Sequence, residues 1–250
     1  MQTITQESVY FYTFHKCAST LFADYVLKNL QGLNHVDYAT QIYNGEEVEA
    51  IEFQRYGVIY GPIRLSVNPH SPVYKRFVSV AAEPEFVKDK LAIFFVRDPR
   101  DMLVSLYYSF GFTHGFSSVP EIREQQAKLR REIQTQTLDE YVIAGAGQVA
   151  GYFSQLQELS RACTRGTLLR YEDLVEDFDK FIECFTSVVT LDQAVIDQIY
   201  QQSRPNQVED TTSHRRSGQA ANYQDKLKES TVAILNQQLA GVLASFGYTP

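Results

Sequence analysis

A strand, a polar loop and the start of a helix follow one another near the beginning of the chain, and they constrain the fold most. Residues 9–14 are a run of β-prone residues, and residues 15–20 form a short segment with a lysine, two small residues and two hydroxyls. An amphipathic stretch then predicts a helix over 21–30. In such a loop, backbone N–H groups and the helix start converge on an anion, while Lys16 adds a point charge. The segment therefore predicts an anion-binding loop.

Strands and helices alternate along the rest of the chain. Residues 91–96 form the most apolar short run, typical of a buried central strand, and residues 56–60 and 167–171 are shorter candidates. Further helices are expected over the following ranges: 99–110, with Asp98 as its cap and Pro99 in its first turn, 138–144, 149–161, 178–188, 194–202 and 231–246. This alternation predicts one α/β domain over residues 1–250, with a central, mainly parallel sheet flanked by helices.

Three segments are less regular. Residues 34–55 are mixed and acidic, and predict a loop with a short helix at most. Residues 118–131 are heavily charged, as in an exposed helix or an excursion from the domain. Residues 203–230 are polar and predict a long loop, and loops of that length are usually functional or disordered.

The composition limits the possible binding partners and the cellular compartment. A formal net charge of −7 argues against generic nucleic-acid binding, although a few cations can still build a local pocket for a small anion. The three cysteines, Cys17, Cys163 and Cys184, are too scattered for a disulfide framework or a zinc site, and favour free thiols in a reducing compartment. The N-terminus lacks the pattern of a secretory signal, and no apolar run is long enough for a membrane span. We expect a soluble, cytoplasmic protein.

Two later segments also carry candidate anion-binding cations. Arg97 directly follows the most buried strand, and Ser105 lies eight residues further, on the helix face of Asp101 and Tyr108. Ligands of open α/β sheets bind beyond the carboxyl ends of the strands. Residues 215–218, Arg-Arg-Ser-Gly, add a basic pair with a glycine that allows close backbone approach to a ligand. The alternatives are an Arg97 that pairs with Asp98 or Asp101, and a basic pair that is only solvated.

The loop around Lys16 differs from the loop that binds nucleoside triphosphates. That loop has glycines before its lysine and a hydroxyl directly after it. Here no glycine precedes Lys16, and the hydroxyls of Ser19 and Thr20 come three and four residues later. An ordinary ATP or GTP site is therefore disfavoured.

Together these segments resemble the sulfotransferases that use 3′-phosphoadenosine 5′-phosphosulfate (PAPS). Residues 14–20, Phe-His-Lys-Cys-Ala-Ser-Thr, stand in the place of that family's Tyr-Pro-Lys-Ser-Gly-Thr-Thr loop. Residues 97–108 match its Arg-x-Pro-x-Asp motif, with the later serine and the Tyr-Tyr pair. Residues 171–174 repeat its Tyr-Glu-Asp-Leu, and residues 216–223 resemble its Arg-Lys-Gly and Gly-Asp-Trp. The resemblance spans nearly the whole chain in the right order and implies a P-loop-like fold of the sulfotransferase type.

The resemblance implies sulfuryl transfer from PAPS, without a metal, to a hydroxyl of a small-molecule, lipid or carrier-bound acceptor, an amine being the second choice. It also implies a set of cofactor-binding residues. They are Lys16, Ala18, Ser19 and Thr20 on the 5′ side; Arg97, Ser105 and Arg216 for the 3′-phosphate, with Ser217 and Gly218 of the same motif; and, near adenine, Leu21 or alternatively Phe22 in the place of the family's stacking aromatic, with Tyr171 and Ser203. Ser217 stands where the family has a lysine.

The catalytic residues implied are Lys16 and a general base, for which His70 is the first choice. In cytosolic members of the family the base is a histidine, but the corresponding residues 61–66 hold none. His35, Asp37 and His15 are the other candidates. A kinase-like phosphotransferase and a non-catalytic nucleotide-binding module are the competing functions. The acceptor, whose pocket we expect within 34–80 and 112–150, and the oligomeric state stay open.

Overall fold

The computed structural model describes residues 6–48, 50–65, 72–205 and 218–250. The chain forms two compact units, which are described separately. The first unit holds residues 1–96 and 158–204, and the second holds residues 97–157 and 205–250. A single domain over residues 1–250 stays a prediction.

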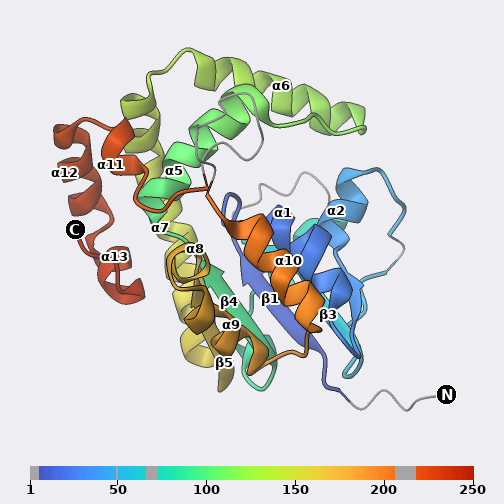
Figure 1. Ribbon diagram of the computed structural model, residues 1–250. Coiled ribbons are helices and arrows are strands. Elements are labelled where there is room, and N and C mark those ends of the chain that lie inside the picture. Colours follow the sequence, from blue (N-terminus) through green and yellow to red (C-terminus); the bar gives the residue numbers. More distant parts are fainter. Residues whose placement is uncertain (1–5, 49, 66–71, 206–217) are drawn as a thin grey trace. The chain divides into compact units, whose positions relative to one another are not determined.

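The first unit is built on a five-stranded parallel sheet with the order β2-β3-β1-β4-β5 (Figure 1). Its strands are β1 (Val9–Thr13), β2 (Asn34–Val36), β3 (Val58–Arg64), β4 (Leu91–Val96) and β5 (Arg165–Arg170). The predicted α/β architecture is confirmed. The prediction for residues 34–55 missed the short edge strand β2, although its short helix is present as α2 (Tyr38–Tyr43).

The strand predicted over 56–60 is present as β3, but its predicted end, before Gly61-Pro62, is wrong. The strand continues to Arg64 because its register against β1 shifts between Tyr10 and Tyr12. This shift accommodates Pro62, which has no N–H to donate to a neighbouring strand. Gly61 has φ +139°, and a Cβ there would come within 2.6 Å of the Phe11 carbonyl oxygen. Only glycine fits this position.

Helices cover both faces of the sheet. The helical segments of this unit are α1 (Ser19–Leu21), η1 (Phe22–Val26), η2 (Leu27–Asn29), α2, α3 (Pro72–Ala81), α4 (Pro84–Val87), α8 (Tyr171–Glu176), α9 (Phe178–Thr186), α10 (Gln193–Ser203) and the end of α7 (Leu138–Ala162). On one face the ring of Phe22 lies 4.6 Å from Phe11 and 4.8 Å from Phe95. On the other face the Tyr12 hydroxyl donates to the Ala81 carbonyl at 2.7 Å.

The segment after the Lys16 loop is helical but irregular. Instead of one α-helix over 21–30, a single α-turn leads into the π-helical η1 and the 3₁₀-helical η2. Helix α10 lies beside α1 and η1 on the same face of the sheet (Figure 1).

The described part of the second unit is helical. It contains α5 (Pro99–Tyr108), η3 (Ser109–Thr113), α6 (Pro120–Gln134), most of α7, α11 (Tyr223–Lys226), α12 (Glu229–Gln238) and α13 (Ala240–Phe246). The predicted start of α5 is confirmed, since the Asp98 carboxylate accepts from the Arg100 N–H at 2.9 Å and Pro99 is the first helical residue. The charged segment after residue 118 is the helix α6.

Two helix predictions were wrong in their limits. The break expected at 145–147 does not occur, because α7 is continuous. Gly145 lets the helix approach α5 closely, since a Cβ there would lie 3.1 Å from the Leu103 side chain. The last predicted helix is divided at Leu239 into α12 and α13. No helix within the described ranges is both long and apolar enough to cross a membrane.

Candidate functional site

The loop between β1 and α1 has an unusual backbone. Lys16 and Ala18 adopt positive φ values of 67° and 51°, which few residues other than glycine adopt. Alternation of left-handed and ordinary backbone is the geometry of an anion-binding nest. Among the residues that the structure describes, the one other non-glycine residue with positive φ is Ala221. Such outliers concentrate at functional sites, so the loop is the first candidate for one.

The side chains of the loop divide between core and surface. Phe14 and Cys17 are fully buried and anchor the loop, whereas Lys16 is half-buried and Thr20 is exposed. Ser19, at the start of α1, is buried with 7% of its surface exposed. The loop is therefore held rigidly while its lysine and one hydroxyl can reach a ligand, which suits an anionic group.

Asp37 lies at the same edge of the sheet as this loop, because the strands are parallel and Asp37 follows β2. It caps α2 by accepting from the Thr40 N–H at 3.0 Å and from the Thr40 hydroxyl at 2.7 Å. Its carboxylate also lies 3.5 Å from the guanidinium of Arg64, at the end of β3. Both side chains of this ion pair are largely buried. Asp37 is thus a fixed carboxylate at the same edge of the sheet as the Lys16 loop.

The histidine candidates are placed differently. His35 lies in β2, where its Nε2 is 2.6 Å from the Gly61 carbonyl oxygen. Because a carbonyl only accepts, Nε2 carries the proton and Nδ1 is the acceptor. Burial lowers the pKa of His35, which keeps the ring neutral at pH 7. His15 is half-buried within the loop beside Lys16. His70 lies outside the described residues.

Tyr171 and Ser203 belong to the same unit as the Lys16 loop. Tyr171 is the buried first residue of α8, directly after β5, and Ser203 is the buried last residue of α10. The Ser203 hydroxyl accepts from Arg204 Nη2 at 3.2 Å. Arg204 also donates to the Leu174 carbonyl at 2.6 Å, near the end of α8. The ends of α8 and α10 are therefore fastened together.

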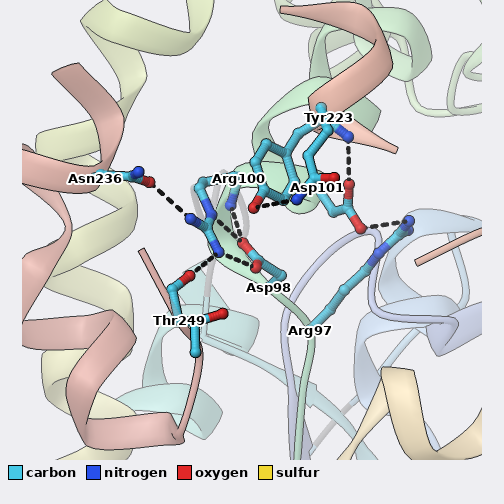
Figure 2. A network of polar contacts seen from close by, with 8 residues as sticks. Arg97, Asp98, Arg100, Asp101, Tyr223, Asn236 and Thr249 are labelled. Atoms are coloured by element: carbon cyan, nitrogen blue, oxygen red, sulfur yellow. Dashed lines mark hydrogen bonds and ion pairs between the residues drawn. The ribbon is translucent and has the colours of Figure 1, made fainter. Parts of the chain in front are cut away.

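In the second unit, Arg97 and the start of α5 hold a segment far along the chain (Figure 2). Arg97 is buried, and its Nη2 donates to the Gln219 carbonyl at 3.0 Å and lies 3.7 Å from Asp101 Oδ2. Asp101 Oδ1 accepts from the Tyr223 N–H at 2.8 Å. The structure thus brings together the two motifs at 97–101 and 218–223, which the sequence separates widely.

The remaining residues predicted for the 3′ side are placed only in part. Gly218 has φ 72°, a left-handed conformation suited to glycine. Ser105 lies one turn after Asp101 and is half-buried, and its hydroxyl has no hydrogen-bond partner among the described residues. Arg216 and Ser217 lie outside the described residues. The expected alternative, a pair between Arg97 and Asp101, is present.

Sequence reasoning missed the part played by Arg100. Its guanidinium is 2% exposed and donates to Asp98 at 2.7 and 3.0 Å, to Asn236 at 2.6 Å and to the Thr249 carbonyl at 2.7 Å (Figure 2). It also lies 4.2 Å from the centre of the Tyr223 ring. Four charged residues within 97–101 were a signal for a buried network, but its distant partners could not be inferred.

The structure is that of an α/β protein in which a left-handed, lysine-bearing loop follows the central strand of a parallel sheet. The sequence matches the sulfotransferase domain family over residues 3–241, so the chain belongs to this family and is a sulfotransferase. A kinase-like phosphotransferase and a non-catalytic module are thereby set aside. A search of curated protein sequences found no match.

Solved structures match this chain at low sequence identity. The mouse sulfotransferase SULT7A1, crystallised in complex with PAP, superposes with a TM-score of 0.56 at 11% identity, covering 95% of this chain and 84% of that one. Retinol dehydratase, in complex with androsterone and the inactive cofactor PAP, gives a TM-score of 0.49 at 13% identity, covering 94% and 80%. Within the described ranges, no group of three or more His, Cys, Asp or Glu side chains could hold a metal ion.

Proposed function

We propose that this sulfotransferase takes its sulfuryl group from PAPS and transfers it to a hydroxyl of a small-molecule, lipid or carrier-bound acceptor. One observation carries the proposal: the non-glycine residues with left-handed backbone in the described chain lie in two segments that also hold a cation. Lys16 and Ala18 are in the first loop, and Ala221 is in the segment whose Gln219 carbonyl accepts from Arg97. Each of these segments sets a cation beside left-handed backbone, an arrangement that suits a phosphate group. The solved mouse relative was crystallised with PAP, which carries phosphates at its 3′ and 5′ positions.

On the 5′ side the Lys16 loop supplies the contacts. The Lys16 ammonium and the N–H groups of the nest would hold the phosphate from which sulfate departs, together with the hydroxyls of Ser19 and Thr20. Donors that are fixed before the reaction stabilise the negative charge that develops on a leaving phosphate. Ala18 contributes backbone, and Leu21 would contact adenine.

On the 3′ side a guanidinium is the expected recognition group, because its planar fork matches a phosphate better than an ammonium does. Arg97 and Ser105 would hold this phosphate from the start of α5. Arg216, Ser217 and Gly218 would approach it from the other motif. Tyr171 and Ser203 are the candidates on the adenine side.

The reaction we propose is an in-line displacement at sulfur. PAPS supplies the sulfuryl group: a bond forms from the acceptor oxygen to sulfur while the bond from sulfur to the bridging phosphate oxygen breaks. Lys16 takes up the negative charge that gathers on that oxygen. The acceptor's proton passes to a general base of the chain. No metal is required in this scheme.

Binding and transfer test this proposal directly. We expect PAP to raise the melting temperature more than ATP does at equal concentration, because ligands stabilise the folded state according to their affinity. We also expect transfer of labelled sulfate from PAPS to one or more members of a screen of hydroxylated apolar molecules and carbohydrates. Equal stabilisation by ATP, together with no labelled product, would contradict the proposal.

The general base can be tested by the pH dependence of the rate. We propose His70 as the base, with Asp37, His35 and His15 as alternatives. If His70 is the base, kcat/KM falls below a pH of about 6.5 in the wild type, and this limb disappears in His70→Ala. The measurement is a pH–rate profile of both proteins. An unchanged profile would exclude His70 and direct the same test to Asp37→Asn.

The cellular setting is also a proposal. All three cysteines are free thiols, with Cys17 and Cys163 buried. Free thiols favour a reducing compartment, so we propose a cytoplasmic location.

A further inference from the structure

We propose that Asp101 is a positioning residue that gives this enzyme its selectivity for a nucleotide with a 3′-phosphate. It acts through Arg97 and through the backbone that follows Gly218. This inference rests on the proposed function, because the 3′-phosphate site is itself part of that proposal.

The geometry places Asp101 between the two motifs (Figure 2). Its side chain is fully buried, with 0% exposed. Oδ1 accepts from the Tyr223 N–H at 2.8 Å, and Oδ2 lies 3.7 Å from Arg97 Nη2. Within the described part of the chain, Oδ2 has no hydrogen-bond donor. One carboxylate therefore fixes the backbone of the later motif with one oxygen and faces the arginine of the earlier motif with the other.

One nitrogen of Arg97, Nη2, makes both of its contacts with this arrangement. Besides its pair with Asp101, its Nη2 donates to the Gln219 carbonyl at 3.0 Å. Gln219 lies between the left-handed residues Gly218 and Ala221. The direction of the Arg97 guanidinium is thus set by Asp101 and by the segment that Asp101 itself holds. Because an arginine recognises phosphate through two parallel N–H groups, its orientation governs its affinity.

Burial of an ionised Asp101 carries a cost in folding stability. Burial raises the pKa of Asp101 and the Asp98 charge raises it further, although Arg97 and the backbone of Tyr223 and Ala221 lower it. A carboxyl whose pKa is higher in the folded than in the unfolded state loses folding stability as the pH rises through that range. Ionised Asp101 therefore costs stability at neutral pH. A neutral side chain of the same shape would avoid this cost, but it would also leave the buried Arg97 without the carboxylate that faces it.

The substitution Asp101→Asn separates the two roles. It keeps Oδ1 as the acceptor for Tyr223, but it places an N–H donor where Oδ2 faced Arg97. We expect the affinity for PAP to fall about tenfold, the loss of one charge-assisted contact. The affinity for 5′-AMP, which lacks the 3′-phosphate, should not change, and the variant should keep a cooperative melting transition. Calorimetric titration measures the affinities for PAP and for 5′-AMP, and hence their ratio. A thermal melt measures the stability of the variant.

Two comparisons complete the experiment. Asp139→Asn is the matched control, since Asp139 is in the same unit, accepts from the Lys228 N–H at 3.2 Å and pairs with the Lys228 ammonium at 3.4 Å. It should leave the PAP to 5′-AMP ratio unchanged. If Asp101 acts through Arg97, the change Asp101→Asn should have no further effect on the ratio in an Arg97→Ala background.

The outcomes distinguish the two proposals. A wild type that binds PAP no more tightly than 5′-AMP overturns the proposed function, and the role of Asp101 with it. A wild type that prefers PAP, with an Asp101→Asn variant that keeps the whole preference, overturns the role of Asp101 alone. A variant that unfolds, or that loses both nucleotides equally, shows a structural role and also overturns it.

Discussion

Replacing Lys16 by alanine abolishes sulfuryl transfer, by our expectation, and leaves the fold intact. Removing one pre-organised donor to a developing negative charge lowers a rate by about 10²–10³-fold, and Lys16 contributes a full charge as well. The fold should survive because the loop is anchored by Phe14 and Cys17, both fully buried, whereas Lys16 is half-buried. The rate is measured as labelled product formed from PAPS.

Lys28→Ala is the matched control for this experiment. Lys28 belongs to the same unit, is 55% exposed in its side chain and pairs with Asp24 only at 3.5 Å. A surface ion pair of this kind contributes about 0–1 kcal/mol, so both rate and stability should match the wild type. Turnover by Lys16→Ala at the wild-type rate would refute the role of the loop. A loss of its melting transition would show that Lys16 is needed for folding instead.

The elements that were predicted well are those whose own residues are enough to identify them. Residues 91–96 are apolar without interruption, and β4 has these limits in the structure. The start of α5 was equally clear, because Asp98 and Pro99 act locally as cap and first residue. Strand β2 has only three residues and no apolar pattern, so nothing local distinguishes it from a loop.

The wrong predictions are cases where distant contacts outweighed local preference. Glycine at 145 disfavours a helix by about 1 kcal/mol, but its small size allows close packing against Leu103. Gly61-Pro62 usually ends a strand, yet the shifted register against β1 accommodates both residues. Neither the Leu103 contact nor the register of β1 can be read from the residues around the glycine.

The candidate site was predictable to the same degree. Lys16, Arg97 and Ser105 follow strands or lie on a helix face, so their positions follow from local pattern and spacing. The role of Asp101 depends on Tyr223, 122 residues away, and that of Arg100 on Asn236, 136 residues away. A charged residue in a motif indicates that it has a partner, but only the fold identifies the partner.

Arg100→Met should be among the most destabilising single changes in the second unit. Arg100 is 2% exposed, and its guanidinium satisfies Asp98, Asn236 and the Thr249 carbonyl. Its removal leaves the buried Asp98 carboxylate without its counter-charge, and breaking a buried pair in this way costs about 3–5 kcal/mol. Denaturant titration of the wild type and the variant measures the free energy of unfolding. Arg131→Met, on the exposed side of α6, is the control and should change it by about 0.5 kcal/mol or less.

A second variant separates loss of charge balance from loss of packing. The double change Asp98→Asn with Arg100→Met removes both charges, so it should be less destabilised than Arg100→Met alone. A double variant that is worse by the sum of both single effects would contradict this, and would assign the stability to the separate contacts with Asn236 and Thr249. The Asp98–Arg100 pair and the Arg97–Asp101 pair both lie at the start of α5. We nevertheless expect different effects when each is broken. Neutralising Asp101 should be seen first as a loss of selectivity for the 3′-phosphate, whereas breaking the Arg100 pair should be seen first as a loss of stability.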